Sequence, residues 1–262
     1  MQIVKNGIAL QTIDDWRTHA PPKSADQWTR GRSAMECATA WFGSAGPCVP
    51  AEIVALLSSH DDTARTQITS ATPDYRVKFN GARGEPRSCD VVASAESDEG
   101  IVAITIEAKA DERFERAVEQ VLADAVDRRA HGGERTGTVA RIEKLAASLL
   151  PPPRRGVPPL GSLRYQLLTA AAGALAYARE LGASRAVLIV HEFVTERAED
   201  RMQATNYADL SAFAARLSDG EHPTVEAGRL LGPLSVPGAP LFERPAALYI
   251  GKAVRRLRQP AA

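Results

Sequence analysis

The segment 101–109 constrains this chain most, because it has the pattern of one β-strand with two unlike faces. Successive side chains of a strand point to opposite faces of a sheet. One face is wholly apolar and consists of Val102, Ile104, Ile106 and Ala108. The other face ends in charge and carries Thr105, Glu107 and Lys109. The pattern predicts a strand that covers a core with one face and presents polar groups on the other.

A second strand, 88–92, precedes this segment, and the residues between the two favour a hairpin. The turn Ser97-Asp98-Glu99-Gly100 is rich in residues that reverse a chain. A hairpin centred there pairs position 97 with position 100 and therefore places Asp90 opposite Glu107. A slip of one residue would send Asp90 to the other face, so this register is itself a prediction.

Two carboxylates placed opposite each other require a compensating charge. Directly opposed residues have Cβ atoms about 4.5 to 5.5 Å apart, and two negative charges that close repel unless a cation lies between them or one is protonated. Mg²⁺ takes oxygen ligands, usually one or two carboxylates completed by water and substrate phosphate. The pair Asp90 and Glu107 therefore predicts a site for Mg²⁺ or Mn²⁺.

This arrangement resembles the PD-(D/E)xK nuclease superfamily, in which an Asp opens one core strand and an acid-x-Lys motif ends the next. The matching residues are Asp90, Glu107 and Lys109, with Cys89 in place of the motif's proline. The resemblance implies an α/β fold with a restriction-endonuclease-like core, a central mixed β-sheet flanked by helices. It also implies that Asp90, Glu107 and the backbone carbonyl of Ala108 hold the metal. Lys109 would position the attacking water during DNA phosphodiester hydrolysis.

Weaker candidates lie outside the hairpin. Glu36 is either a further metal ligand on the opening helix or a surface charge. Gln166 and Arg164, at the start of a strong helix, are candidates for contacting a substrate phosphate, and Arg164 could instead simply flank the helix. His191 and Glu192 end an apolar strand, but the sequence names no partner for either.

The remaining pattern predicts one α/β domain over 1–262, with a core at about 24–195 and a helix-strand extension over 196–262. Pro73, Gly81, Gly84 and Pro86 predict an irregular segment over 61–87, and the prolines of 151–159 predict a connector. Helices are predicted over 24–43, 51–59, 112–129, 139–149, 163–181 and 207–217. Further strands are predicted over 185–193, 229–234 and 247–254.

Composition limits the partners. The chain has 32 basic and 32 acidic side chains, so any nucleic-acid contact depends on a local patch rather than a global field. Three cysteines without CxxC spacing and an N-terminus without an apolar secretion segment favour a reduced, cytoplasmic compartment. The longest apolar run, 167–178, is too short to span a bilayer.

Two functions remain open. One is a metal-dependent nuclease of bacterial defence or DNA processing that acts on DNA, as a homodimer or with partner proteins. The other is a degenerate member of the same fold that binds nucleic acid or protein without catalysis. The bland alternative for the motif itself is that Glu107 and Lys109 are only solvated charges at a strand end. Serine-hydrolase, P-loop and HExxH motifs are absent from the sequence.

Overall fold

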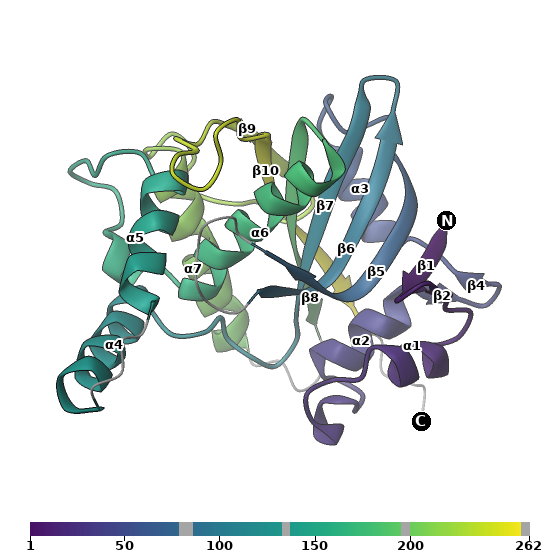
Figure 1. The fold of residues 1–262 in the computed structure, drawn as a ribbon. Helices are drawn as coiled ribbons and strands as arrows, with labels where there is room; N and C mark the ends of the chain where they lie inside the picture. Colours follow the sequence, from purple (N-terminus) through teal and green to yellow (C-terminus); the bar gives the residue numbers. More distant parts are fainter. Residues whose placement is uncertain (79–85, 133–136, 195–199, 258–262) are drawn as a thin grey trace.

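The central element of the fold is an eight-stranded mixed sheet (Figure 1). The computed structural model describes residues 1–78, 86–132, 137–194 and 200–257. The strands of this sheet, in spatial order, are β2 (Ile8–Ala9), β1 (Gln2–Lys5), β5 (Gln67–Val77), β6 (Arg87–Ser97), β7 (Gly100–Lys109), β8 (Arg185–Val194), β10 (Ala247–Arg256) and β9 (Leu230–Leu234). Three neighbouring pairs are parallel, β1–β5, β7–β8 and β8–β10, and the others are antiparallel. The predicted mixed sheet is therefore confirmed.

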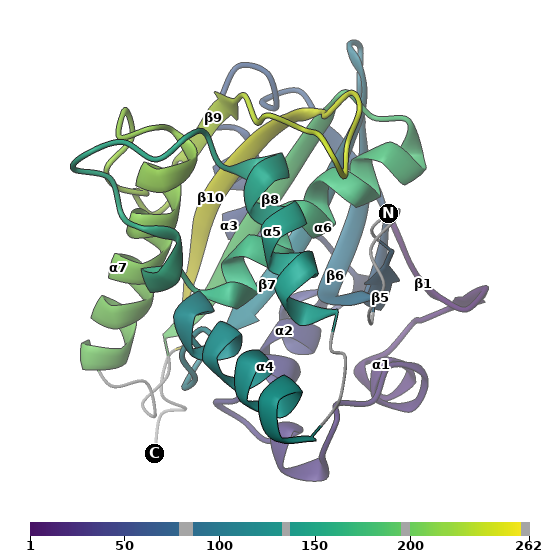
Figure 2. The ribbon, with the colours of Figure 1, turned by 60° about the vertical axis from the view of Figure 1, so that its left-hand side comes forward.

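Helices cover both faces of the sheet, and each face has its own core (Figures 1 and 2). The first side carries α1 (Ile13–His19), α2 (Ser33–Ala40) and α3 (Ala51–Leu57). The second side carries α4 (Val118–Gly132), α5 (Thr138–Leu149), α6 (Tyr165–Leu181) and α7 (Asp200–Leu217). Two 3₁₀ turns, η1 (Ala25–Gln27) and η2 (Leu160–Ser162), and a small hairpin of β3 (Phe42–Gly43) and β4 (Gly46–Pro47) complete the elements. We call the two faces the α1–α3 side and the α4–α7 side.

Helix α6 is the last of the three helices, α4, α5 and α6, that connect the parallel strands β7 and β8. Every residue from Gln166 to Ala178 is buried, as expected for a helix that is apolar nearly all round. Gly182 ends it in the left-handed conformation, with φ of 66°, which glycine adopts without a steric penalty. The predicted helix over 163–181 and the strand that follows it are both confirmed.

The predicted irregular segment over 61–87 is wrong, because it contains β5. Pro73 argued against a strand in the sequence, but within the sheet it lies opposite Val91 and its carbonyl accepts a hydrogen bond from Lys5 Nζ at 3.0 Å. Polar residues on the exposed positions also hid the pattern. Gly81 and Gly84, which supported the irregular assignment, lie outside the described residues.

Other boundaries also differ from the sequence prediction. The helix expected over 24–43 is only η1 and α2, because Gly31 between them has φ of 84° and interrupts the helical path. The helix expected from 112 begins at Val118, since residues 112–117 run as a loop in which Ala117 bridges to Arg164. Strands β1 and β2 and helix α1 precede the core that the sequence placed from residue 24, and β9 and β10 add the C-terminal extension to the same sheet. Among the described residues, every helix is too short or too polar to cross a lipid bilayer.

Candidate active site

The β6–β7 hairpin has the predicted register. Ser97 pairs with Gly100, and the ladder continues to Val91 and Ile106, one step before Asp90 and Glu107. The four apolar side chains of β7 all pack on the α1–α3 side. Asp90 and Glu107 therefore stand at the end of the hairpin ladder, where the two strands stop pairing regularly.

Strand β6 changes faces at Asp90. Val91 packs on the α1–α3 side, whereas Cys89, two residues earlier, packs on the α4–α7 side. The neighbouring β5 does the same around Asp74, which the register places opposite Asp90 and which has a left-handed φ of 43°. The Asp90 carboxylate accepts a hydrogen bond from the Ala108 N–H at 2.7 Å, in the place where a regular ladder bond would lie. The irregularity thus ties the Asp90 carboxylate to β7.

Glu107 is the centre of a buried ionic network on the α4–α7 side. Its Oε1 accepts hydrogen bonds from Lys109 Nζ at 3.0 Å and from the side-chain amide of Gln166, and its Oε2 accepts one from Arg87. Glu107 and Lys109 are each only 4% exposed. We call Arg87, Asp90, Glu107, Lys109 and Gln166 the Glu107 cluster.

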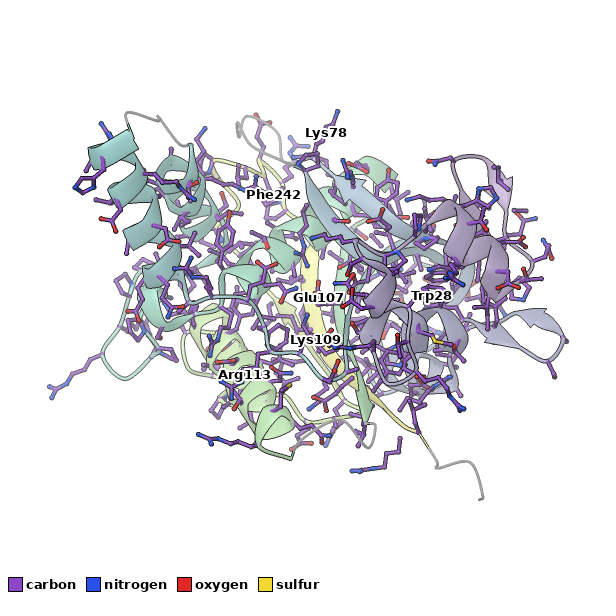
Figure 3. The ribbon with its side chains drawn as sticks, turned by 90° about the horizontal axis from the view of Figure 1, so that it is seen from below. Trp28, Lys78, Glu107, Lys109, Arg113 and Phe242 are labelled. Carbon is purple, nitrogen blue, oxygen red and sulfur yellow. The ribbon has the colours of Figure 1, made fainter. Side chains whose placement is uncertain are left out.

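A cavity of about 820 Å³ opens onto the Glu107 cluster. Figure 3 shows Glu107 and Lys109 near the centre of the molecule in a view along the end of the sheet, with Trp28 to one side on the segment before α2. All five residues of the cluster line the cavity, together with Ala108 and with residues of the α1–α2 region such as Trp28 and Arg32. The cluster is therefore buried among protein atoms yet open to a ligand from one direction.

The charges of the cluster are unevenly compensated. Loss of water around the carboxyl and the negative charge of Glu107 raise the pKa of Asp90 to about 7, although the side chain is exposed to the cavity. Burial alone would raise the pKa of Glu107, but the nearby Arg87 and Lys109 and its hydrogen bonds hold it below its usual value. Burial opposes the charge of Lys109, yet Glu107 and Asp90 raise its pKa, so it stays protonated at neutral pH. Among the described residues, Asp90 is thus the carboxylate of the cluster that has no cation paired with it.

Gln166 is brought into the site, and its amide is oriented from both ends. Its Nε2 donates to Glu107, while its Oε1 accepts a hydrogen bond from the Glu115 N–H at 3.2 Å. Arg164 occupies the position before the first residue of α6, pairs with Asp209 at 2.9 Å and is not among the residues that line the cavity. Glu36 is buried rather than a surface charge, and its carboxylate accepts a hydrogen bond from the Gly31 N–H at 2.7 Å, also away from the cavity lining.

Arg87 is the residue of the Glu107 cluster that the sequence analysis did not find. Simple alternation places residue 87 on the face opposite Asp90, and only the change of face at Asp90 brings its guanidinium to Glu107. No motif spacing marks it. Its position beside the first residues of the predicted strand was the only available signal.

The pair His191 and Glu192 turns out to have partners on opposite sides of the sheet. His191 Nε2 lies 2.7 Å from Glu52 Oε1, and Glu52 also pairs with Arg255, whose Nε donates at 2.6 Å. Glu192 instead pairs with the buried Lys252 at 2.8 Å on the α4–α7 side. We call Glu52, His191 and Arg255 the Glu52 cluster, and none of its members lines the cavity.

The donor set of the Glu107 cluster fits a hard cation that keeps most of its water. The described residues contain no group of three or more histidine, cysteine or acidic side chains suited to hold a metal. Mg²⁺, however, commonly binds through one or two carboxylates, which Asp90 and Glu107 offer beside the Ala108 carbonyl. The under-compensated charge of Asp90 also favours a cation, although Glu107 Oε2 becomes available only if Arg87 releases it.

A family model described as a domain of unknown function (DUF6946) matches residues 9–246. The chain therefore belongs to this family. No curated protein and no solved structure matches the chain.

Proposed function

We propose that the protein is a metal-dependent phosphodiesterase that hydrolyses DNA and has a restriction-endonuclease-like core. The observation that carries this proposal is the convergence of Asp90, Glu107 and Lys109 on one cavity wall, at the end of the β6–β7 hairpin. Such a protein would serve DNA processing or defence.

The topology supports the proposal. Strands β5, β6 and β7 are consecutive and antiparallel, and the chain then crosses through α6 to β8, which lies parallel to β7. Helix, hairpin, helix and strand in this order are what the restriction-endonuclease-like core requires.

Asp90, Glu107 and the Ala108 carbonyl would hold Mg²⁺ or Mn²⁺. When bound, the ion supplies polarisation of the phosphoryl group and a water of lowered pKa. Lys109 contributes a fixed positive charge: Glu107 holds its Nζ at 3.0 Å, and the ammonium lies 5.3 Å from the centre of the Phe114 ring. Because Lys109 stays protonated, it donates to the attacking water or the scissile phosphate and does not accept a proton.

The lining of the cavity is close to neutral, with six cations and five acidic side chains, Asp74, Asp90, Glu107, Glu112 and Glu115, so a bound divalent cation would make it positive towards a polyanion. The cations that line the cavity are Lys23, Arg32, Arg76, Arg87, Lys109 and Arg141. They come from the α1–α2 region, the sheet and α5, so they surround the proposed site instead of forming one stripe.

The second candidate is a binding module without catalysis. One observation favours it: Arg87, Lys109 and Gln166 already satisfy both oxygens of Glu107 without a metal. A protein whose site is complete in this way could bind DNA or a protein and cleave nothing.

Calorimetry with Mn²⁺ separates the two candidates, supported by cleavage assays on single- and double-stranded DNA and RNA. The phosphodiesterase predicts a binding heat that disappears in Asp90→Asn, and cleavage that requires Mg²⁺ or Mn²⁺. Thr105→Val is a matched control, since Thr105 lies on the same face of β7 two residues before Glu107. Nucleic-acid binding that is indifferent to metal, without cleavage, would establish the module instead.

A further inference from the structure

Arg87 holds an unusual position, because a guanidinium occupies the carboxylate oxygen that a metal would need. It donates to Glu107 Oε2, and its side chain is 12% exposed. Lys109 and Gln166 bind the other oxygen, so Arg87 alone blocks Oε2 among the described residues. In the metal-free protein Arg87 therefore acts as the counter-ion of Glu107.

The guanidinium is only partly satisfied in this position. Arginine carries five N–H donors, and the Nε of Arg87 is buried without a hydrogen-bond partner in the described structure. An unpaired buried donor costs free energy, so an anion that reached it would be bound favourably. Phosphate oxygens fit the arginine fork in pairs.

The attachment of Arg87 allows the head group to turn while its stem stays in place. The Arg87 Cγ lies 3.4 Å from the point where a Cβ on Gly173 of α6 would be, so the stem lies close against the small residue of a buried helix. The guanidinium end lines the 820 Å³ cavity. Rotation of the outer side-chain bonds would carry the charge from Glu107 towards the cavity without moving β6.

The charges of the cluster favour rotation of the Arg87 guanidinium away from Glu107 when a divalent cation binds. With Asp90 ionised, the cluster itself carries two negative charges, on Asp90 and Glu107, and two positive charges, on Arg87 and Lys109, and Glu112 and Glu115 line the same cavity. A divalent cation would leave the cluster with an excess of two positive charges. A phosphodiester is the anion that the proposed reaction brings to the same cavity.

We propose that Arg87 is an exchangeable counter-ion, which pairs with Glu107 in the metal-free protein and turns to the substrate phosphate when a divalent cation binds. The inference rests on the proposed function and adds a substrate-positioning residue to it. Metal and DNA then promote each other's binding through Arg87. The metal displaces Arg87 from Glu107 and frees the guanidinium for a DNA phosphate, and a bound phosphate holds Arg87 away from the carboxylate oxygen that the metal needs.

The test measures binding without turnover, using Mn²⁺ alone by calorimetry and short fluorescent DNA with Ca²⁺ in place of Mg²⁺. Arg87→Gln should bind Mn²⁺ about 5-fold or more tightly than the natural protein, since the competitor for Glu107 is gone. Its DNA affinity should fall about 10-fold with Ca²⁺ present and change little in EDTA, because the arginine contacts phosphate only after exchange.

Arg76→Gln is the matched control, since Arg76 is an exposed arginine that lines the same cavity from β5. It should leave Mn²⁺ affinity unchanged and weaken DNA binding equally with and without Ca²⁺. If Arg87→Gln behaves in the same way, Arg87 is an ordinary phosphate contact and the exchange is refuted.

Two further measurements keep the inference testable. If Arg87→Gln fails to fold, Arg87→Lys takes its place in the binding measurements, because lysine keeps the positive charge. A crystal of the natural protein soaked with Mn²⁺ shows the position of Arg87 directly. Arg87 turned away from Glu107 beside a bound ion supports the exchange, and Arg87 still on Oε2 overturns it. Absence of any Mn²⁺ binding to the natural protein removes the metal-dependent function itself, and that failure is visible before any variant is made.

Discussion

The two ionic clusters lie on opposite sides of the same end of the sheet, and their electrostatics differ. In the Glu52 cluster, hydrogen bonds from His191 and Arg255 overcome the effect of burial and hold the pKa of Glu52 at about 2. In the Glu107 cluster, both neighbouring cations, Arg87 and Lys109, pair with Glu107. Burial and the negative charge of Glu107 raise the pKa of Asp90 to about 7. The Glu52 carboxylate is thus paired within its own cluster, whereas among the described residues Asp90 has no cation of its own.

The two clusters also differ in their access to the cavity. The strand register places Ala108 of β7 directly beside His191 of β8, so the two clusters are close in the sheet. Yet only the Glu107 cluster lines the cavity, while His191 is fully buried. Buried charge alone is therefore a weaker pointer to a candidate site than a carboxylate that faces a cavity and has no paired cation among the described residues.

The largest expected effect is on catalysis, and it distinguishes the clusters most sharply. Glu107→Ala should abolish cleavage, and Lys109→Ala should lower the rate about 10²- to 10³-fold, because each removes charge from the reacting centre. Glu52→Ala should keep its rate per folded molecule. Single-turnover assays on DNA with Mg²⁺ check this, and equal loss in Glu52→Ala would show that the comparison fails.

The next effect is on stability, to which Glu52 should contribute although it does not line the cavity. Glu52→Ala should destabilise the protein by roughly 2 kcal/mol, because it removes the hydrogen-bond partner of Arg255 and of the buried His191. Urea unfolding at pH 7 measures the difference. The double variant Glu52→Ala with Arg255→Met should recover part of the loss, and no recovery would mean that the unpaired charge of Arg255 is not what lowers the stability.

The clusters should also respond to pH with opposite signs. Because its folded pKa lies below the ordinary 4.5, Glu52 stabilises the fold above that pH, and this stability is lost as the pH falls towards 2. Asp90 has a folded pKa above the ordinary 3.8, so its contribution is present below pH 3.8 and is lost as the pH rises to about 7. In EDTA, Asp90→Asn should therefore flatten the pH dependence of unfolding between pH 4 and 7. Parallel curves for the variant and the natural protein would contradict the assignment.

The smallest effect concerns a neighbour that belongs to neither cluster. Thr105 is 1% exposed, and its hydroxyl has no partner among the described residues. Thr105→Val should raise the free energy of unfolding by up to about 1 kcal/mol, since it removes an unpaired polar group, and should leave cleavage unchanged. A loss of cleavage in this variant would show that substitutions on this face of β7 act through packing, which would weaken the result for Glu107.

Local pattern was enough to predict the hairpin, its register and the apolar face of β7, because period-two alternation and a turn of reversing residues fix both. It was not enough for β5, where Pro73 and exposed polar residues hid the strand. It also could not find Arg87, since a change of face at Asp90 breaks the alternation on which such reasoning depends. Partners distant in sequence, such as Glu52 for His191, follow from packing alone.

The sequence by itself determined which carboxylates and which lysine stand at the end of one hairpin, because strand pairing between adjacent segments needs only local information. The tertiary structure decided which of them are compensated. It brought Arg87 and Gln166 within hydrogen-bond distance of Glu107 and left Asp90 facing the cavity. On the other side of the sheet it paired His191 with Glu52. Charge compensation depends on distances between elements far apart in the chain, and only the packing of helices on both faces of the sheet sets those distances.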